Sequence, residues 1–152
     1  MFDDLTDLYQ QVILDHSKSP RNFHAMKDAT RKAQGTNPLC GDNVTLYVRM
    51  EGDVVKDVSF EGSGCAISKA SASILTDCLK GKTRAEVHEL FKQVREMVTT
   101  GRMPEGDPGK LAVFAGVHKF PARVKCAILP WHAALSAVDG KEETVSTESE
   151  QD

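Results

Sequence analysis

Apolar residues recur with a helical period at the start of the chain. They occupy positions i, i+3, i+4, i+7 and i+8: Leu5, Leu8, Tyr9, Val12 and Ile13. This spacing predicts an amphipathic helix from about Phe2 to His16, because these positions share one face of an α-helix. Residues 17–37 show no sustained period and contain proline and glycine, so we predict a long loop there.

The pattern then changes to an alternation with a period of two. The alternating apolar residues are Val44, Leu46, Val48 and Met50. They predict a half-buried strand, because successive side chains of a strand point to opposite faces. A second strand is predicted from Val54 to Phe60. Residues 51–53 form the turn between the two strands, which together make a hairpin.

Helical patterns return after the hairpin. A helix rich in small residues is predicted from Ala66 to Leu79, with Gly81 as its stop signal. Residues 83–86 (TRAE) form a capping box, which predicts the start of a helix that continues to about Thr100. A loop follows at 102–110 and a short helix at 111–118. The last helix is predicted from Pro121 to Val138, because proline suits a first helical turn.

These elements predict one compact domain of the α/β class, in its α+β form, with a small antiparallel sheet packed against helices. The predicted domain spans residues 1–138. Residues 139–152 are polar and acidic and lack apolar anchors, so we predict a disordered tail.

Composition narrows the classes of function. The 152 residues suffice for one domain with a core, and the net charge is −3. No basic run with interleaved aromatic residues is present, which argues against nucleic acid as a partner. No apolar run approaches the roughly 20 residues that a membrane span needs. The acidic N-terminus lacks the positive region of a secretory signal, so we expect a cytoplasmic protein. In that reducing compartment, the four cysteines suggest metal binding, catalysis or burial rather than disulfides.

Candidate chemistry centres on residues 37–42 (NPLCGD). Cys40 and Asp42 are two positions apart, so in an extended segment they point to the same side. Cys65, in the string GSGCA, follows the second strand of the hairpin, at the same end as the start of the first strand. Cys126 lies in the last helix. We therefore hypothesise that three thiols and one carboxylate converge on one metal or sulfur-handling site.

Thiolates are soft ligands that favour zinc, copper(I) or iron–sulfur clusters. Three sulfurs and one oxygen suit tetrahedral Zn²⁺, although the spacing is not that of a zinc finger. Arg123 precedes Cys126 by three positions and so shares a helix face with it; it either stabilises a thiolate or persulfide there or is a solvated surface residue. Cys40, on a loop, is expected to be accessible and to act as a nucleophile.

Other residues have simpler explanations. His16 and His24 are either extra ligands or surface histidines, and the surface interpretation is favoured. Cys78 follows Ile74 along one helical face and is interpreted as a small buried apolar residue. Pro130 lies inside the pattern of the last helix, where it is expected to cause a kink.

At these positions the sequence resembles the scaffold proteins of iron–sulfur cluster assembly, the IscU/NifU N-terminal family, and most of all its SufU branch. The matching strings are LYQQVILDH with PRN (8–16 and 20–22), NPLCGD (37–42), FEGSGCAIS (60–68) and KFPARVKC (119–126). Two features differ from the IscU branch. Lys125 stands where IscU proteins have a histidine before the third cysteine, and their chaperone-docking string, Leu-Pro-Pro-Val-Lys, is absent. The chain between Thr100 and Cys126 is also longer, as in SufU proteins.

The resemblance implies a compact fold with a small sheet flanked by helices. It also implies a zinc site, with the ligands Cys40, Asp42, Cys65 and Cys126. By the same resemblance, the chain is expected to be a zinc-dependent sulfurtransferase that accepts persulfide sulfur on Cys40 from a SufS-type cysteine desulfurase. A SufBCD-type scaffold is a further expected partner, downstream.

Two other functions stay open at this point. The same ligands suit the assembly of a [2Fe–2S] cluster on an iron-binding scaffold. The absence of a histidine before Cys126 and of the chaperone-docking string argues against this alternative. The third hypothesis is a structural zinc domain that binds partners without chemistry, in which Cys40 would be inert.

Overall fold

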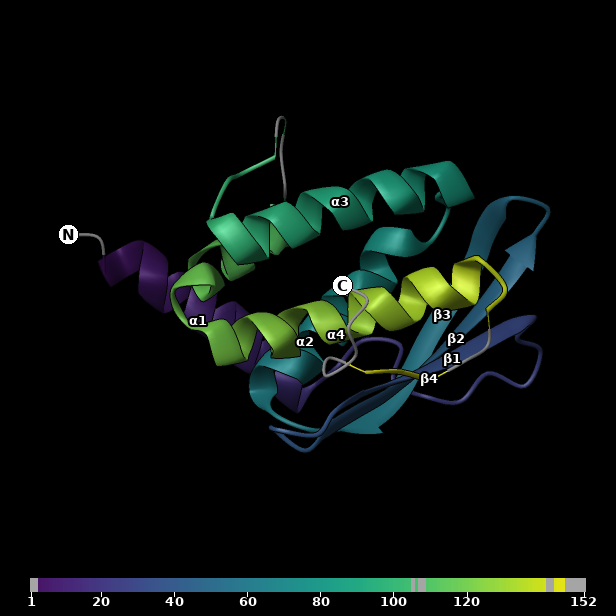
Figure 1. The fold of residues 1–152 in the computed structure, drawn as a ribbon, viewed down its shortest axis with the longest axis horizontal. Helices are drawn as coiled ribbons and strands as arrows, with labels where there is room; N and C mark the ends of the chain where they lie inside the picture. Colours follow the sequence, from purple (N-terminus) through teal and green to yellow (C-terminus); the bar gives the residue numbers. More distant parts are fainter. Residues whose placement is uncertain (1–2, 105, 107–108, 142–143, 147–152) are drawn as a thin grey trace.

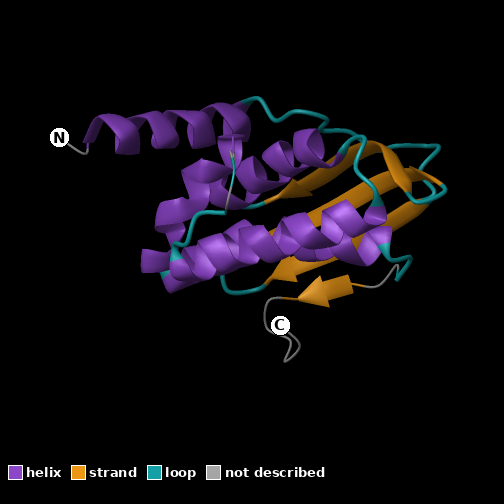
Figure 2. Ribbon diagram, turned by 90° about the horizontal axis from the view of Figure 1, so that it is seen from above, coloured by secondary structure: helices purple, strands orange, loops and turns teal. Residues whose placement is uncertain are grey.

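The computed structural model describes residues 3–104, 106, 109–141 and 144–146 (Figure 1). The elements in chain order are α1 (Asp3–Lys18), β1 (Arg31–Asn37), β2 (Asp42–Glu51), β3 (Val54–Ser63), α2 (Ala66–Leu79), α3 (Arg84–Thr100), the 3₁₀ helix η1 (Gly109–Lys119), α4 (Pro121–Val138) and β4 (Thr144–Ser146). Figure 1 shows α4 lying across β1 and β2, with α3 on the side of α4 away from the sheet. Figure 2 shows the strands as one curved sheet beside the helices. This arrangement confirms the α+β class.

The sheet has the strand order β3-β2-β1-β4. The predicted hairpin is β2 and β3, which pair antiparallel, with Leu46 opposite Phe60. β1 also pairs antiparallel with β2, whereas β4 lies parallel to β1. The predicted antiparallel sheet is thus confirmed for β1 to β3, and β4 adds a parallel edge strand that makes the whole sheet mixed.

The strand β1 lies within residues 17–37, so the prediction of a loop there is wrong for residues 31–37. Its buried positions are Ala33, Gly35 and Asn37, none of which is a large apolar residue, so the alternation was not visible in the sequence. The small residues allow a close approach of α4: a Cβ added at Gly35 would lie 2.9 Å from Cδ1 of Leu129. This strand reaches the site region at its last residue, Asn37.

The predicted tail also contains structure. Residues 144–146 pair with residues 34–36 of β1, and the Asp139 carboxylate accepts hydrogen bonds from Arg84 at 2.9 Å and His88 at 2.8 Å. These contacts correct the expectation of disorder for the described part of the tail. Residues 142–143 and 147–152 lie outside the described residues, and the domain boundary at residue 138 stays a prediction.

The helix signals of the sequence are confirmed. The capping box opens α3: Thr83 Oγ1 accepts the Glu86 N–H at 3.1 Å, and the Glu86 carboxylate accepts the Thr83 N–H at 2.9 Å. α3 ends at Gly101, whose φ is 83°, a left-handed conformation that suits glycine. The predicted short helix at 111–118 is the longer 3₁₀ helix η1, and α4 runs through Pro130 without ending there. Among the described residues, no helix combines the length and apolar character needed to cross a bilayer.

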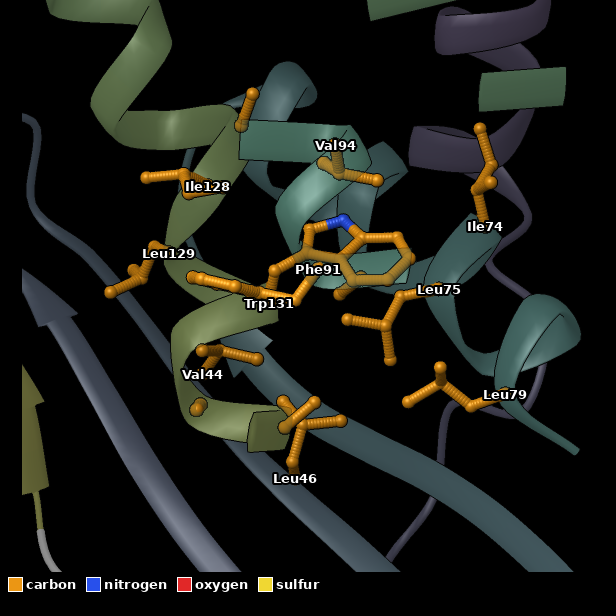
Figure 3. Packing of buried hydrophobic residues seen from close by; sticks show 14 of the residues in the cluster. Val44, Leu46, Ile74, Leu75, Leu79, Phe91, Val94, Ile128, Leu129 and Trp131 are labelled. Atoms are coloured by element: carbon orange, nitrogen blue, oxygen red, sulfur yellow. The ribbon is translucent and has the colours of Figure 1, made fainter. Parts of the chain in front are cut away.

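The core fixes α4 between the sheet and α3. Figure 3 shows the indole of Trp131 among Phe91, Val94 and Leu75, with Val44 and Leu46 of β2 nearby. Trp131 is 1% exposed, so its large apolar surface is almost fully removed from water. Because Cys126 lies five residues earlier in α4, the packing of Trp131 also fixes the position of that thiol.

Candidate metal centre

The loop between β1 and β2 presents Cys40. Asn37 at the end of β1 pairs with Asp42 at the start of β2, so residues 38–41 form the connection. The Cys40 N–H donates to the Asn37 carbonyl at 3.2 Å, and Gly41 adopts a φ of 72°. Glycine takes this left-handed conformation without steric cost. The resulting turn leaves Cys40 exposed, as the sequence predicted.

The end of β3 brings Cys65 to the same place. Asn43 pairs with Ser63, which confirms that the start and the end of the hairpin are neighbours. Cys65 is the N-cap of α2, and its sulfur accepts the Ser68 N–H at 3.4 Å. The Cys65 N–H donates to Asp42 Oδ1 at 2.8 Å, and the Cys65 sulfur lies 3.9 Å from Asp42 Oδ2.

α4 supplies the third thiol. Cys126 is fully buried, and its sulfur lies 3.5 Å from the sulfur of Cys40. Donor atoms of Cys40, Asp42 and Cys126 all lie within 4.8 Å of one another. With Cys65 beside Asp42, the structure brings together all four residues that the sequence singled out. Their role as metal ligands stays a prediction.

The donor set fits a zinc ion. It comprises three thiols and a carboxylate, a combination that zinc accepts in tetrahedral sites. Asp42 and Cys126 are both buried, with exposed fractions of 2% and 0%. Burial raises the pKa of the Cys126 thiol, and hydrogen bonding with Asp42 raises it further. A bound cation would offset that burial and stabilise the thiolate, because ligation deprotonates a thiol.

Arg123 lies on the exposed side of this cluster. Electrostatic interaction with Cys65 and hydrogen bonding with Cys126 raise the pKa of Arg123. Arg123 is thus close enough to the thiols to interact with them electrostatically, in agreement with its helical spacing to Cys126. Its participation in chemistry stays a prediction.

The other candidates lie elsewhere. His16 is 1% exposed, and its Nδ1 is 2.7 Å from Ser73 Oγ, so the favoured interpretation as a surface histidine is wrong. His24 is exposed, with Nδ1 at 2.9 Å from the Ala25 carbonyl oxygen. Neither histidine belongs to the cluster of donor atoms found among the described residues. Cys78 is half-buried against the core, and burial raises its pKa to about 11. That environment agrees with its interpretation as an unreactive apolar residue.

Two contacts of the site were not predicted from the sequence. Asn37 is completely buried, and its Nδ2 donates to Asp42 Oδ2 at 3.3 Å and to the Cys126 sulfur at 3.5 Å. Ser71 of α2 donates its hydroxyl to the Ala127 carbonyl at 2.6 Å, which ties the two helices together beside Cys126. The sequence signal for Asn37 was its place in the string NPLCGD, where it stands five residues before Asp42.

Comparison with known proteins identifies the family of the chain. Residues 8–127 match the NifU-like N terminal domain. The chain belongs to this family. It is 42% identical over 140 residues to the zinc-dependent sulfurtransferase SufU of Bacillus subtilis, covering 91% of this chain and 94% of that protein. It is 40% identical to the iron–sulfur cluster assembly scaffold protein IscU of Streptococcus pyogenes, over 88% of this chain and 84% of that one.

A solved structure shares the fold. It is a putative iron–sulfur cluster assembly scaffold protein for the SUF system from Fervidobacterium islandicum, with a TM-score of 0.79 and 38% identity. The match covers 84% of this chain and 94% of that one. The SufU/IscU-like fold that the resemblance implied is thus confirmed.

Proposed function

We propose that this chain is a zinc-dependent sulfurtransferase that accepts persulfide sulfur from a SufS-type cysteine desulfurase for iron–sulfur cluster assembly. The observation that carries the proposal is the asymmetry of the cluster. Cys40 is exposed on a loop, whereas Asp42 and Cys126 are buried within 4.8 Å of it. One thiol can therefore meet a large partner while the others stay in the fold. The similarity to a relative named as a zinc-dependent sulfurtransferase supports this function.

Cys40, Asp42, Cys65 and Cys126 would hold the zinc. When bound, zinc supplies a positive charge that keeps thiols deprotonated and orders the loop. Because Cys40 is on the exposed loop, it is the ligand that can leave the cluster with the least disturbance of the core. Asp42, a harder oxygen ligand, makes the set less tightly binding than four thiolates would be.

The transfer step is a thiol–disulfide type of exchange. The Cys40 thiolate attacks the outer sulfur of the desulfurase persulfide. A new sulfur–sulfur bond forms at Cys40 Sγ, the donor's own sulfur–sulfur bond breaks, and the donor cysteine leaves as a thiolate. The proton of the outer sulfur stays with it or is exchanged with water. No external oxidant is needed, because the transferred sulfur keeps its oxidation state.

Arg123 would support this step electrostatically. Its guanidinium already interacts with the thiols of Cys65 and Cys126. A positive charge at that position stabilises both the attacking thiolate and the persulfide product. The sulfur would then pass to a SufBCD-type scaffold, and the cytoplasm stays the expected location.

An iron–sulfur scaffold is the second candidate. It is favoured by relatives named as IscU scaffolds, such as the Streptococcus pyogenes protein. In that case the same four residues would hold a [2Fe–2S] cluster, which thiolates also bind well.

The metal and acid-labile sulfide content of protein purified without oxygen distinguishes the candidates. The sulfurtransferase predicts about one zinc per chain, as in a four-ligand zinc site, and no sulfide. Iron and sulfide in equal amounts would favour the scaffold. A folded protein that takes up neither zinc nor iron would contradict both.

A further inference from the structure

Asn37 is not one of the candidate ligands, but its side-chain amide contacts two of them. Asn37 ends β1 and has no exposed surface. Its Nδ2 donates to Asp42 Oδ2 at 3.3 Å and to the Cys126 sulfur at 3.5 Å. One amide group thus contacts two acceptors that come from different elements, β2 and α4.

Asp42 is held from its other side as well. Its Oδ1 accepts the Cys65 N–H at 2.8 Å, while its Oδ2 faces the Asn37 amide. An ionised carboxylate only accepts hydrogen bonds, so two donors on different oxygens fix the plane of the group. The direction of the lone pairs that remain is then determined by the fold.

We propose that Asn37 is a positioning residue that orients Asp42 and Cys126 together for metal binding. This inference rests on the proposed zinc site. The amide N–H groups reduce the repulsion between two buried acceptors that both carry negative charge when a metal is bound. Outer partners of this kind orient ligands and typically change metal affinity about 10–100-fold when they are removed. Both acceptors are buried, whereas Cys40 is exposed, so the pair that Asn37 contacts stays oriented when Cys40 leaves.

The test compares zinc affinity in Asn37→Leu with that in Asn43→Leu. Asn43 lies on the same hairpin but is exposed, and its amide donates to Ser63 Oγ at 3.0 Å instead of to a candidate ligand. Zinc affinity is measured by competition with a chromophoric chelator. We expect about 10–100-fold weaker binding for Asn37→Leu and no change for Asn43→Leu. The visible spectrum of the Co²⁺-loaded protein is expected to shift only in Asn37→Leu, because it reports ligand geometry.

A double-mutant cycle separates positioning from a general structural role. If Asn37 acts through Asp42, the loss of affinity caused by Asn37→Leu becomes much smaller in an Asp42→Ala background. A loss of the same size in both backgrounds would overturn the proposal, as would unchanged affinity in Asn37→Leu.

A smaller variant, Asn37→Ser, keeps the test decisive if the leucine variant does not fold. It removes the amide while leaving a polar side chain at the end of β1. We expect zinc affinity to fall in this variant too, and wild-type affinity would overturn the proposal. Zinc binding by the wild type with no effect of either variant overturns only the role of Asn37. Absence of zinc binding in the wild type overturns this inference together with the proposed function.

Discussion

Gly64 is the residue whose replacement most directly tests how the site is assembled. Its φ is +153°, in a region that L-residues rarely adopt. A Cβ built on Gly64 would collide with Asp42 Oδ1 and lie 3.0 Å from the Asp42 Cα. Since the Cα belongs to β2, only the carboxylate can rotate away easily. Gly64→Ala is therefore expected to turn Asp42 out of the cluster.

The size of the effect follows from two contributions. A rotated carboxylate loses the Cys65 N–H bond, which is 2.8 Å long. A hydrogen bond to a charged group contributes about 1.5–3 kcal/mol. The strained backbone conformation costs about 1–3 kcal/mol once alanine replaces the glycine. We therefore expect Gly64→Ala to lower the free energy of unfolding of the metal-free protein by about 4 kcal/mol. Zinc binding is expected to weaken by more than the roughly 10–100-fold that is typical of losing a partner behind the ligands, since Asp42 is itself a proposed ligand and no longer faces the thiols.

Gly52→Ala is the matched control. Gly52 also has a positive φ, +59°, but an added Cβ meets nothing within 4 Å, and the residue lies in the turn at the opposite end of the hairpin. The left-handed conformation costs alanine about 1–2 kcal/mol. Both variants are studied by urea unfolding and by competition for zinc with a chelator. Gly52→Ala should show this modest loss of stability and wild-type zinc affinity. Wild-type zinc affinity in Gly64→Ala, or an equal loss of affinity in both variants, would show that Gly64 does not hold Asp42 in the cluster.

Three further predictions concern reactivity, pH and charge. In the zinc-loaded protein, iodoacetamide should alkylate the exposed Cys40 well before the buried Cys126, as followed by peptide mass spectrometry; an inert Cys40 would instead indicate a closed structural site. Burial lowers the pKa of His16, so the unfolded chain binds a proton at this residue more readily than the folded chain does. The contribution of neutral His16 to stability is complete above pH 6.5, the ordinary pKa of histidine. This contribution is lost as the pH falls through 6.5 toward the lowered pKa of His16 in the folded protein. His16→Gln should flatten this part of the curve of unfolding free energy against pH, whereas substitution of the exposed His24 by Gln should leave it unchanged. Arg123→Gln should slow sulfur transfer severalfold without changing the unfolding free energy, and Arg123→Lys should restore part of the rate; equal rates for all three proteins would contradict an electrostatic role.

The helices were predictable because their signals are local. The capping box at Thr83 and the left-handed glycine at Gly101 specify the ends of α3 from a few neighbouring residues. β1 was not predictable in the same way, because its buried positions carry small or polar residues that pack closely under α4. β4 depends on pairing with β1, so its three residues carry too little pattern of their own.

The residues of the candidate site also differ in whether local sequence could predict their positions. Cys40, Asp42 and Cys65 were predictable because a hairpin brings its start and end together. Cys126 comes from a helix far along the chain, so its convergence with the other three was a hypothesis from ligand chemistry, which the resemblance to a family strengthened. The role of Asn37 depends on a contact across 89 positions, between the end of β1 and the second turn of α4, which no local pattern shows.

In the proposed function, Cys40 is the thiol that accepts the sulfur. The most direct measurement is the position of the persulfide after the zinc-loaded protein has been incubated with a SufS-type desulfurase and cysteine, with free persulfides trapped by alkylation and located by peptide mass spectrometry. We expect the extra sulfur on Cys40, and none on the half-buried Cys78. Sulfur on Cys65 or Cys126 with Cys40 unmodified, or no persulfide on any cysteine while the desulfurase turns over, would contradict it.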